Sequence, residues 1–183
     1  MSETAERWRK LAGDFTQRVE AVPNGSWDSP APCEGWVARD VVRHLTDWMP
    51  GLFLGGAGLH IPEAPSVDDD PAGAWRAVDG AVQAALDDPE SAQRMTDTRA
   101  GKMTLEQLVE MTGLMDVLVH TWDLARATDQ DEVLDQGEVH AFLLGIEPWD
   151  AALRSSGHYG ARVPVPDDAD EQTRLIAFTG RRP

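Results

Sequence analysis

The segment from Thr104 to Thr128 places the strongest constraint on the fold, because its apolar residues recur at helical spacing for about seven turns. Thr104 followed by Gln107 fits a capping box, which predicts that the helix starts there. The apolar positions form one broad face: Leu105, Leu108, Val109, Met115, Leu118, Val119 and Trp122. A helix with so broad an apolar face has to pack against other elements, so it predicts a core.

The remaining patterns are also mostly helical. Apolar spacing and turn signals predict helices over residues 3–22, 37–48, 75–86, 133–153 and 171–178, with Pro50-Gly51 ending the second. Met95 and Met103 flank a short strand or turn, and residues 160–166 read as extended chain. Residues 51–74 form a long connection, which is either a crossover or a functional loop. We therefore expect an all-α protein, a helical bundle with a crossover.

Composition limits the classes of function. A chain of 183 residues suggests one domain with at most a small appendage, and a net charge of −16 argues against a nucleic-acid partner. No apolar run reaches membrane-spanning length, and residues 1–7 do not resemble a signal peptide. Cys33 is the single cysteine, which excludes an intramolecular disulfide framework and a cysteine-rich zinc site. A cytoplasmic protein is the simplest expectation.

Asp116 and His120 are the first candidate site residues. Four residues apart on a helix, a carboxylate and an imidazole stack on one side and can reach one metal ion. His44 is the best third ligand, because it borders the apolar face of another predicted helix and bundle sites are built from facing helices. The alternative is a hydrogen-bonded Asp–His pair at the surface, with His44 as an ordinary core or surface histidine.

Other candidates carry weaker signals. Cys33 is a ligand, a nucleophile or a small buried hydrophobe. Asp47 and Asp123 each follow a histidine by three residues, so they either orient a ligand imidazole or serve as caps and surface carboxylates. The remaining histidines read as surface or loop residues: His60, His140 and His158.

The stretch Pro32-Cys33-Glu34-Gly35-Trp36-Val37-Ala38-Arg39-Asp40-Val41-Val42-Arg43-His44-Leu45 resembles a family signature. It is similar to the "PCxGWxVRDVVAHL" motif of the DinB/YfiT-like metalloenzyme superfamily, in the actinobacterial branch that includes mycothiol-dependent maleylpyruvate isomerase. Asp116, His120, Trp122, Asp123 and Leu124 resemble the second motif of that branch, and residues 163–166 and 175–181 resemble its ending.

The resemblance implies a DinB-like four-helix bundle with a crossover. Residues 1–183 would form one metal-binding domain, with 150–183 as a short C-terminal appendage. It also implies a divalent metal held by His44, His120 and the acidic residue between them in the motif, which is Glu in the isomerase and Asp116 here. Such ligands suit zinc first, with nickel or iron as alternatives, and three of them leave a coordination position open.

Two hypotheses for function follow. In the first, the protein is a metal-dependent enzyme that activates a low-molecular-weight thiol, mycothiol in the first place, for S-transfer, isomerisation or detoxification of an electrophilic substrate. In the second, it is a non-catalytic bundle that binds a metal or small ligand, in a stress-linked role. A fourth protein ligand such as Cys33 or His158 would favour the second. A homodimer is a further expectation, with no nucleic-acid or membrane partner.

Overall fold

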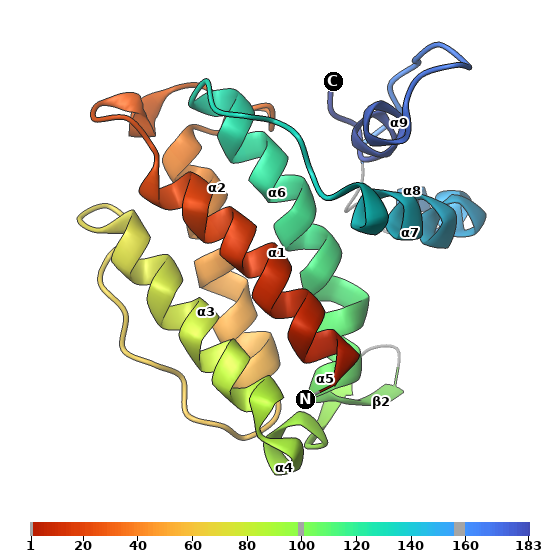
Figure 1. The fold of residues 1–183 in the computed structure, drawn as a ribbon. Coiled ribbons are helices and arrows are strands. Elements are labelled where there is room, and N and C mark those ends of the chain that lie inside the picture. Colours follow the sequence, from red (N-terminus) through yellow and green to blue (C-terminus); the bar gives the residue numbers. More distant parts are fainter. Residues whose placement is uncertain (1, 99–100, 156–159) are drawn as a thin grey trace.

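Four long helices lie side by side in the protein, as a computed structural model of the chain describes it for residues 2–98, 101–155 and 160–183 (Figure 1). They are α1 (Glu3–Glu20), α2 (Ala38–Met49), α3 (Pro71–Asp87) and α6 (Leu114–Ala127). Helices α1 and α2 each contact both α3 and α6. The apolar faces of the four therefore meet in one core, and the prediction of a mostly helical protein is confirmed.

Large aromatic side chains fill this core. Phe15 of α1 meets Trp75 of α3 edge to face, with ring centroids 4.7 Å apart, and both are fully buried. The indole of Trp8 donates to Asp79 Oδ1 at 2.9 Å, and that of Trp75 donates to Thr16 Oγ1 at 2.8 Å. Both tryptophans are therefore buried without leaving an indole N–H unpaired, which would be costly.

The connection between α2 and α3 lies along the outside of this group. Helix α2 ends at Met49, beside the predicted stop at Pro50-Gly51, but the chain continues directly as a π-helical segment, η2 (Pro50–Gly55), which was not predicted. Pro50 takes the first position of the new segment, where a missing N–H costs little. Residues 59–66 have no helix or strand. Arg39 donates to the carbonyl oxygens of Val67 and Asp68, and Arg43 pairs with the Asp68 carboxylate at 2.7 Å. These contacts hold the connection against α2.

After α3 and the short α4 (Pro89–Ala92) comes an antiparallel pair of strands, β1 (Met95–Thr98) and β2 (Gly101–Thr104). The next helix begins at the predicted capping box of Thr104 and Gln107. It consists of α5 (Leu105–Leu108), a π-helical segment η3 (Val109–Gly113) and α6. The long predicted helix is thus confirmed, with a π-helical segment inside it that the periodicity did not predict.

The last part of the chain forms a second helical group. The prediction of one continuous helix over residues 133–153 is wrong. The chain instead forms α7 (Gln136–Ile146), a 3₁₀ turn η4 (Glu147–Trp149) and α8 (Asp150–Ser155). The break comes at Pro148, which has no N–H to continue an α-helix. Helix α9 (Glu171–Phe178) matches its prediction and packs on α7.

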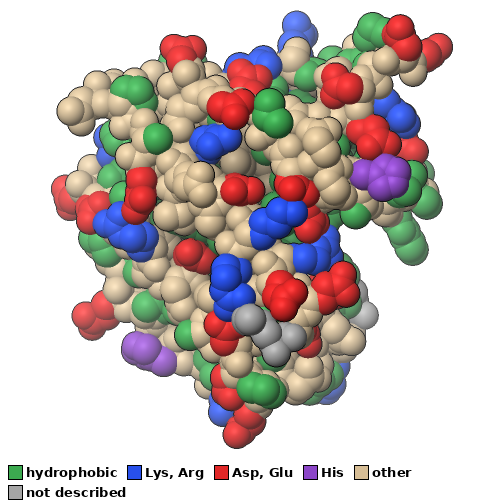
Figure 2. All heavy atoms as spheres, viewed as in Figure 1, with side chains coloured by type: hydrophobic (Ala, Val, Ile, Leu, Met, Phe, Trp, Pro, Cys, Tyr) green, Lys and Arg blue, Asp and Glu red, His purple; other side chains and the backbone are tan. Residues whose placement is uncertain are grey.

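Arg7 of α1 joins the two groups through a two-pronged ion pair with Glu138 of α7, 2.7 Å at the closest approach. Acidic side chains are spread over the face seen in Figure 2, with basic ones among them. None of the helices in the described ranges has the length and apolar character that crossing a membrane requires.

Candidate metal centre

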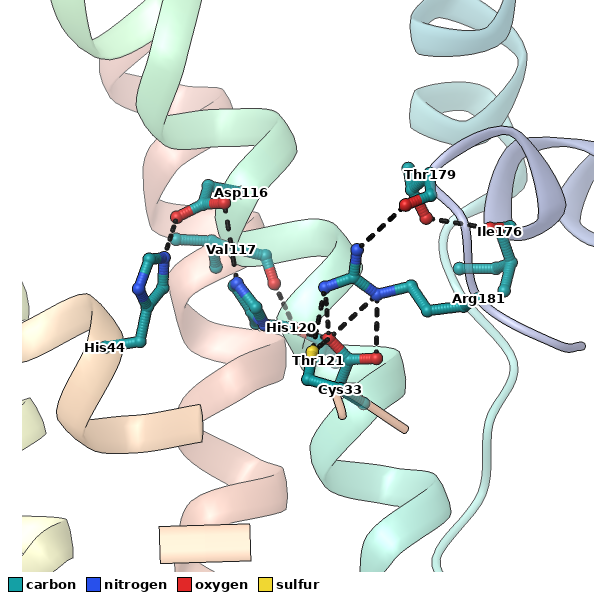
Figure 3. A network of polar contacts seen from close by, with 10 residues as sticks. Cys33, His44, Asp116, Val117, His120, Thr121, Ile176, Thr179 and Arg181 are labelled. Atoms are coloured by element: carbon teal, nitrogen blue, oxygen red, sulfur yellow. Dashed lines mark hydrogen bonds and ion pairs between the residues drawn. The ribbon is translucent and has the colours of Figure 1, made fainter. Parts of the chain in front are cut away.

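Helices α2 and α6 bring His44, Asp116 and His120 together (Figure 3). His44 Nε2 lies 3.1 Å from Asp116 Oδ2, and His120 Nε2 lies 3.5 Å from Asp116 Oδ1. One ligand atom from each residue lies within 4.8 Å of the other two. The two imidazole nitrogens and the carboxylate therefore converge on one point between the helices.

The three side chains differ in their contact with solvent. His120 is buried, with 5% of its side chain exposed, whereas His44 and Asp116 are 34% and 31% exposed. Burial alone would raise the pKa of Asp116, but the neighbouring imidazoles of His120 and His44 outweigh it, and the pKa is lowered. Asp116 is therefore a carboxylate anion at neutral pH, reachable from one side.

Indole rings flank the cluster. Trp36 stacks on His120, with centroids 5.8 Å apart and planes inclined by 14°, and its ring also lies 5.3 Å from that of His44. Trp48, one turn after His44 on α2, has its ring 6.2 Å from the imidazole. These rings restrict how far His44 and His120 can turn.

Asp123 lies behind His120, on the side away from Asp116. Its Oδ2 is 2.8 Å from His120 Nδ1, and its side chain has no exposed surface. The two atoms are at ion-pair distance, but the N–H direction does not meet the geometry of a hydrogen bond, and Nδ1 has no hydrogen-bond partner among the described residues. The contact nevertheless fixes the orientation of the ring, so that its Nε2 edge points to Asp116.

Arg181 supplies the charge that balances Asp123. Its Nε donates to Oδ1 at 3.0 Å and its Nη2 to Oδ2 at 2.7 Å. Burial alone would raise the pKa of Asp123, but the contacts with His120 and Arg181 outweigh it and lower the pKa to about 2. Asp123 is therefore ionised beside the buried imidazole.

Cys33 completes this polar cluster. Arg181 Nη2 lies 3.3 Å from its sulfur, and the thiol lies 3.5 Å from Asp123 Oδ2. Burial, with the charge of Asp123 as the next cause, raises the pKa of Cys33 to about 12. The residue is therefore a protonated thiol at neutral pH, which makes it a poor nucleophile as it stands.

The residues present fit the divalent metal that the family resemblance implies. Two imidazole nitrogens and a carboxylate are a common ligand set for zinc and its neighbours in the first transition row. Asp116 has one methylene fewer than the Glu of the isomerase, yet each of its oxygens faces one of the two imidazoles. The shorter side chain therefore reaches both candidate ligands.

Of the other candidate residues, Asp123 lies against His120, the first of its two alternatives, and Asp47 is exposed on α2, the second. His140 pairs with Glu171 at 2.9 Å, away from the cluster, and His60 is exposed. His158 lies outside the described residues.

The sequence reasoning missed the role of Trp36 and Arg181, although both stood in the stretches that resembled the family. The signal that points to Arg181 is Asp123: once buried, it needs a cation, and Arg126 on the same helix pairs with Glu132 instead.

The family of the mycothiol maleylpyruvate isomerase N-terminal domain, which belongs to the DinB/YfiT-like superfamily, is detected at residues 8–52. This confirms the resemblance predicted from the first motif. The matched segment contains Trp36 and His44, whereas Asp116 and His120 follow it in the chain. The curated proteins and the solved structures gave no significant match.

Proposed function

We propose, from the family match over residues 8–52 and the convergence of His44, Asp116 and His120, that this protein is a metal-dependent enzyme acting with a low-molecular-weight thiol. Mycothiol is the first candidate for the thiol, and the reaction is S-transfer, isomerisation or detoxification of an electrophilic substrate. The proposal treats residues 1–183 as one DinB-like four-helix bundle with a crossover, and 150–183 as its appendage. A homodimer in the cytoplasm is the expected form.

The observation that carries the proposal is the position of the three ligand atoms around one point, with two of the side chains partly exposed. Three protein ligands leave a coordination position open, which is typical of catalytic rather than structural zinc sites. A divalent metal bound there would lower the pKa of a coordinated thiol and hold it as a thiolate.

The protein's own residues would orient the ligands and shape the approach. Asp123 faces His120 Nδ1, which leaves Nε2 directed toward Asp116. Trp36 covers the face of the buried imidazole, so a substrate has to approach from the side of His44 and Asp116. The ionised Asp116 supplies the negative charge that a divalent cation needs.

One observation favours the alternative, a bundle that binds a metal or small ligand without catalysis. Two cavities, of about 410 and 270 Å³, lie elsewhere in the described structure: one between Glu147 and Arg174, the other beside Leu11 and Asp131. Neither is lined by His44, Asp116 or His120. These two cavities are therefore candidate places for a small ligand away from the three metal ligands.

The test is the metal content of purified protein, measured by elemental analysis. We expect near-stoichiometric zinc or nickel in the wild type and its loss in His44→Ala and in His120→Ala. His140→Ala is the matched control, since this exposed histidine pairs with Glu171, and it should keep the metal. Metal-free wild type after reconstitution would leave Asp116 and His120 as a structural pair and remove the enzyme proposal.

The metal-loaded protein is then assayed with thiols and electrophiles. Thiol-dependent turnover that is lost in His44→Ala but kept in His140→Ala would support the enzyme. Tight metal binding without thiol affinity or turnover would support the non-catalytic alternative.

A further inference from the structure

His120 lies between two clusters of potential metal ligands. On its Nε2 side are His44 and Asp116, and on its Nδ1 side are Cys33 and Asp123. In the second cluster, too, one ligand atom from each of the three residues lies within 4.8 Å of the others. The two clusters share one imidazole, and neutral imidazole has a lone pair on one nitrogen only.

The second cluster has a donor set that metals favour. A sulfur, an imidazole nitrogen and a carboxylate oxygen suit zinc, and the sulfur suits a softer ion such as cadmium even better. Asp123 has no exposed surface and His120 has 5%, so the cluster is also largely dry. By chemistry alone it would compete with the first cluster for a metal.

A cation already lies in this second cluster. The guanidinium of Arg181 is 2.7 Å from Asp123 Oδ2 and 3.3 Å from the sulfur of Cys33. Arginine keeps its positive charge under all ordinary conditions. A metal ion entering between Cys33 and Asp123 would have to displace this group or share the space with a like charge.

The end of α9 delivers Arg181 to this position. Gly180 has a φ of +92°, a left-handed conformation that glycine adopts without strain, and its N–H donates to Ala177 O at 3.1 Å. Arg181 N–H then donates to Ile176 O at 3.3 Å, so the backbone turns back over the end of the helix. The side chain leaves this turn toward α6, with 16% of it exposed.

We propose that Arg181 fills the Cys33–His120–Asp123 cluster as an internal cation and thereby directs a metal ion to the Nε2 side of His120. Because Arg181 balances its charge, Asp123 stays a carboxylate next to His120 Nδ1, and a proton on that nitrogen is favoured. The lone pair that can bind a metal ion is then on Nε2. Arg181 is thus a positioning residue that acts through Asp123. The consequence for metal placement rests on the proposed function, whereas the filled cluster can be tested by itself.

The test titrates the protein with cadmium alone and records the ultraviolet cadmium–thiolate charge-transfer band. In the wild type we expect no band, because Cys33 is not free to bind. In Arg181→Met the band should appear and saturate at one cadmium per sulfur, and it should vanish in Arg181→Met/Cys33→Ser. Arg181→Lys keeps a positive charge and should behave like the wild type.

Two results would overturn the inference: a thiolate band in the wild type, or no band in a folded variant that lacks the charge. Circular dichroism reports folding, and Arg181→Gln, which can still donate to Asp123, replaces Arg181→Met if the latter does not fold. Repeating the titration in a His44→Ala background separates the two proposals. The charge-transfer band depends on Cys33 and is independent of the first cluster. The cadmium titration can therefore still be interpreted if the wild type binds no metal at His44, Asp116 and His120.

Discussion

The buried Asp123 and the half-buried Asp79 show how neighbouring charges decide the state of a carboxyl group. Asp123 has the imidazole of His120 at 2.8 Å and the guanidinium of Arg181 at 2.7 Å, and its pKa falls to about 2 in spite of burial. Among the residues that the structure describes, the partner of Asp79 is the neutral indole N–H of Trp8 at 2.9 Å. There burial outweighs the hydrogen bond, and the pKa of Asp79 is raised from its ordinary 3.8. Asp123 is therefore stable as an anion, whereas ionised Asp79 destabilises the folded protein at neutral pH.

This difference predicts that Asp79→Asn stabilises the protein at pH 7. The folded protein holds the proton of Asp79 more tightly than the unfolded chain does, so the Asp79 contribution to stability is fully present below pH 3.8 and is lost as the pH rises through the raised pKa. Asn accepts the Trp8 hydrogen bond without a charge. Thermal melts from pH 3 to 7 should show a gain in Tm over the wild type at pH 7 that shrinks toward pH 3.

Asp47→Asn is the control for this comparison, because Asp47 is exposed on α2. It should change the free energy of unfolding by less than about 0.5 kcal/mol. An unchanged or lower Tm for Asp79→Asn at pH 7 would show that ionised Asp79 is well accommodated.

At the scale of elements, the two π-helical segments adjoin the helices that carry the candidate ligands. Segment η2 follows α2, which holds His44, and η3 precedes α6, which holds Asp116. They meet each other through Phe53 and Gly113: a Cβ on Gly113 would lie 2.9 Å from Phe53 Cζ and 3.2 Å from Trp8 Cζ3. The close approach of η2 to η3 therefore depends on the missing side chain of Gly113.

Gly113→Ala should destabilise the protein by about 1–3 kcal/mol, the usual cost of overpacking a core. The matched control is Gly80→Ala on α3, where an added Cβ meets nothing within 4 Å. That change should stabilise by about 0.4–1 kcal/mol, because it only restricts the unfolded chain. Urea denaturation measures both. Equal effects of the two substitutions would mean that η3 adjusts freely.

The helices with strong periodicity were predictable, because one apolar face per helix is a local property of the sequence. That holds for α1, α2, α3, α6 and α9, and for the capping box at Thr104. The π-helical segments were not predictable, since contacts such as Phe53 with Gly113 join residues far apart in the chain. The pairing of Arg181 with Asp123 was not predicted for the same reason. The four-residue helical spacing of Asp116 and His120, in contrast, was enough to predict that they lie together.

At the scale of the whole molecule, α1 joins the four-helix group to the α7–α9 group. Arg7 binds Glu138 with both prongs of its guanidinium, and Lys10 Nζ lies 2.7 Å from Asp135, the cap of α7. The side chains of Arg7 and Glu138 are 21% and 10% exposed, so this ion pair is partly shielded from solvent. It is therefore stronger than the exposed pairs on the surface.

Glu138→Gln should lower the free energy of unfolding by about 1.5–3 kcal/mol, the range for hydrogen bonds to charged groups. It should also speed limited proteolysis after residue 130, as α7 loses its anchor on α1. Glu20→Gln is the control: its pair with Arg76 is half exposed on both sides, and its loss should cost less than about 1 kcal/mol. Identical denaturation curves for the two variants would place the attachment elsewhere, for example in the contacts of Arg181.

The contact between α1 and α6 also sets the order in which a newly made chain can mature. Ribosomes add about 5–20 residues per second, so α6 is completed roughly 5–20 s after α1. Until then the apolar side of α1 that α6 will cover is open, which makes the growing chain a natural client for chaperones. His44 leaves the ribosome before the other two candidate ligands, Asp116 and His120. By the proposed ligand set, metal binds only after α6, which carries Asp116 and His120, has been synthesised.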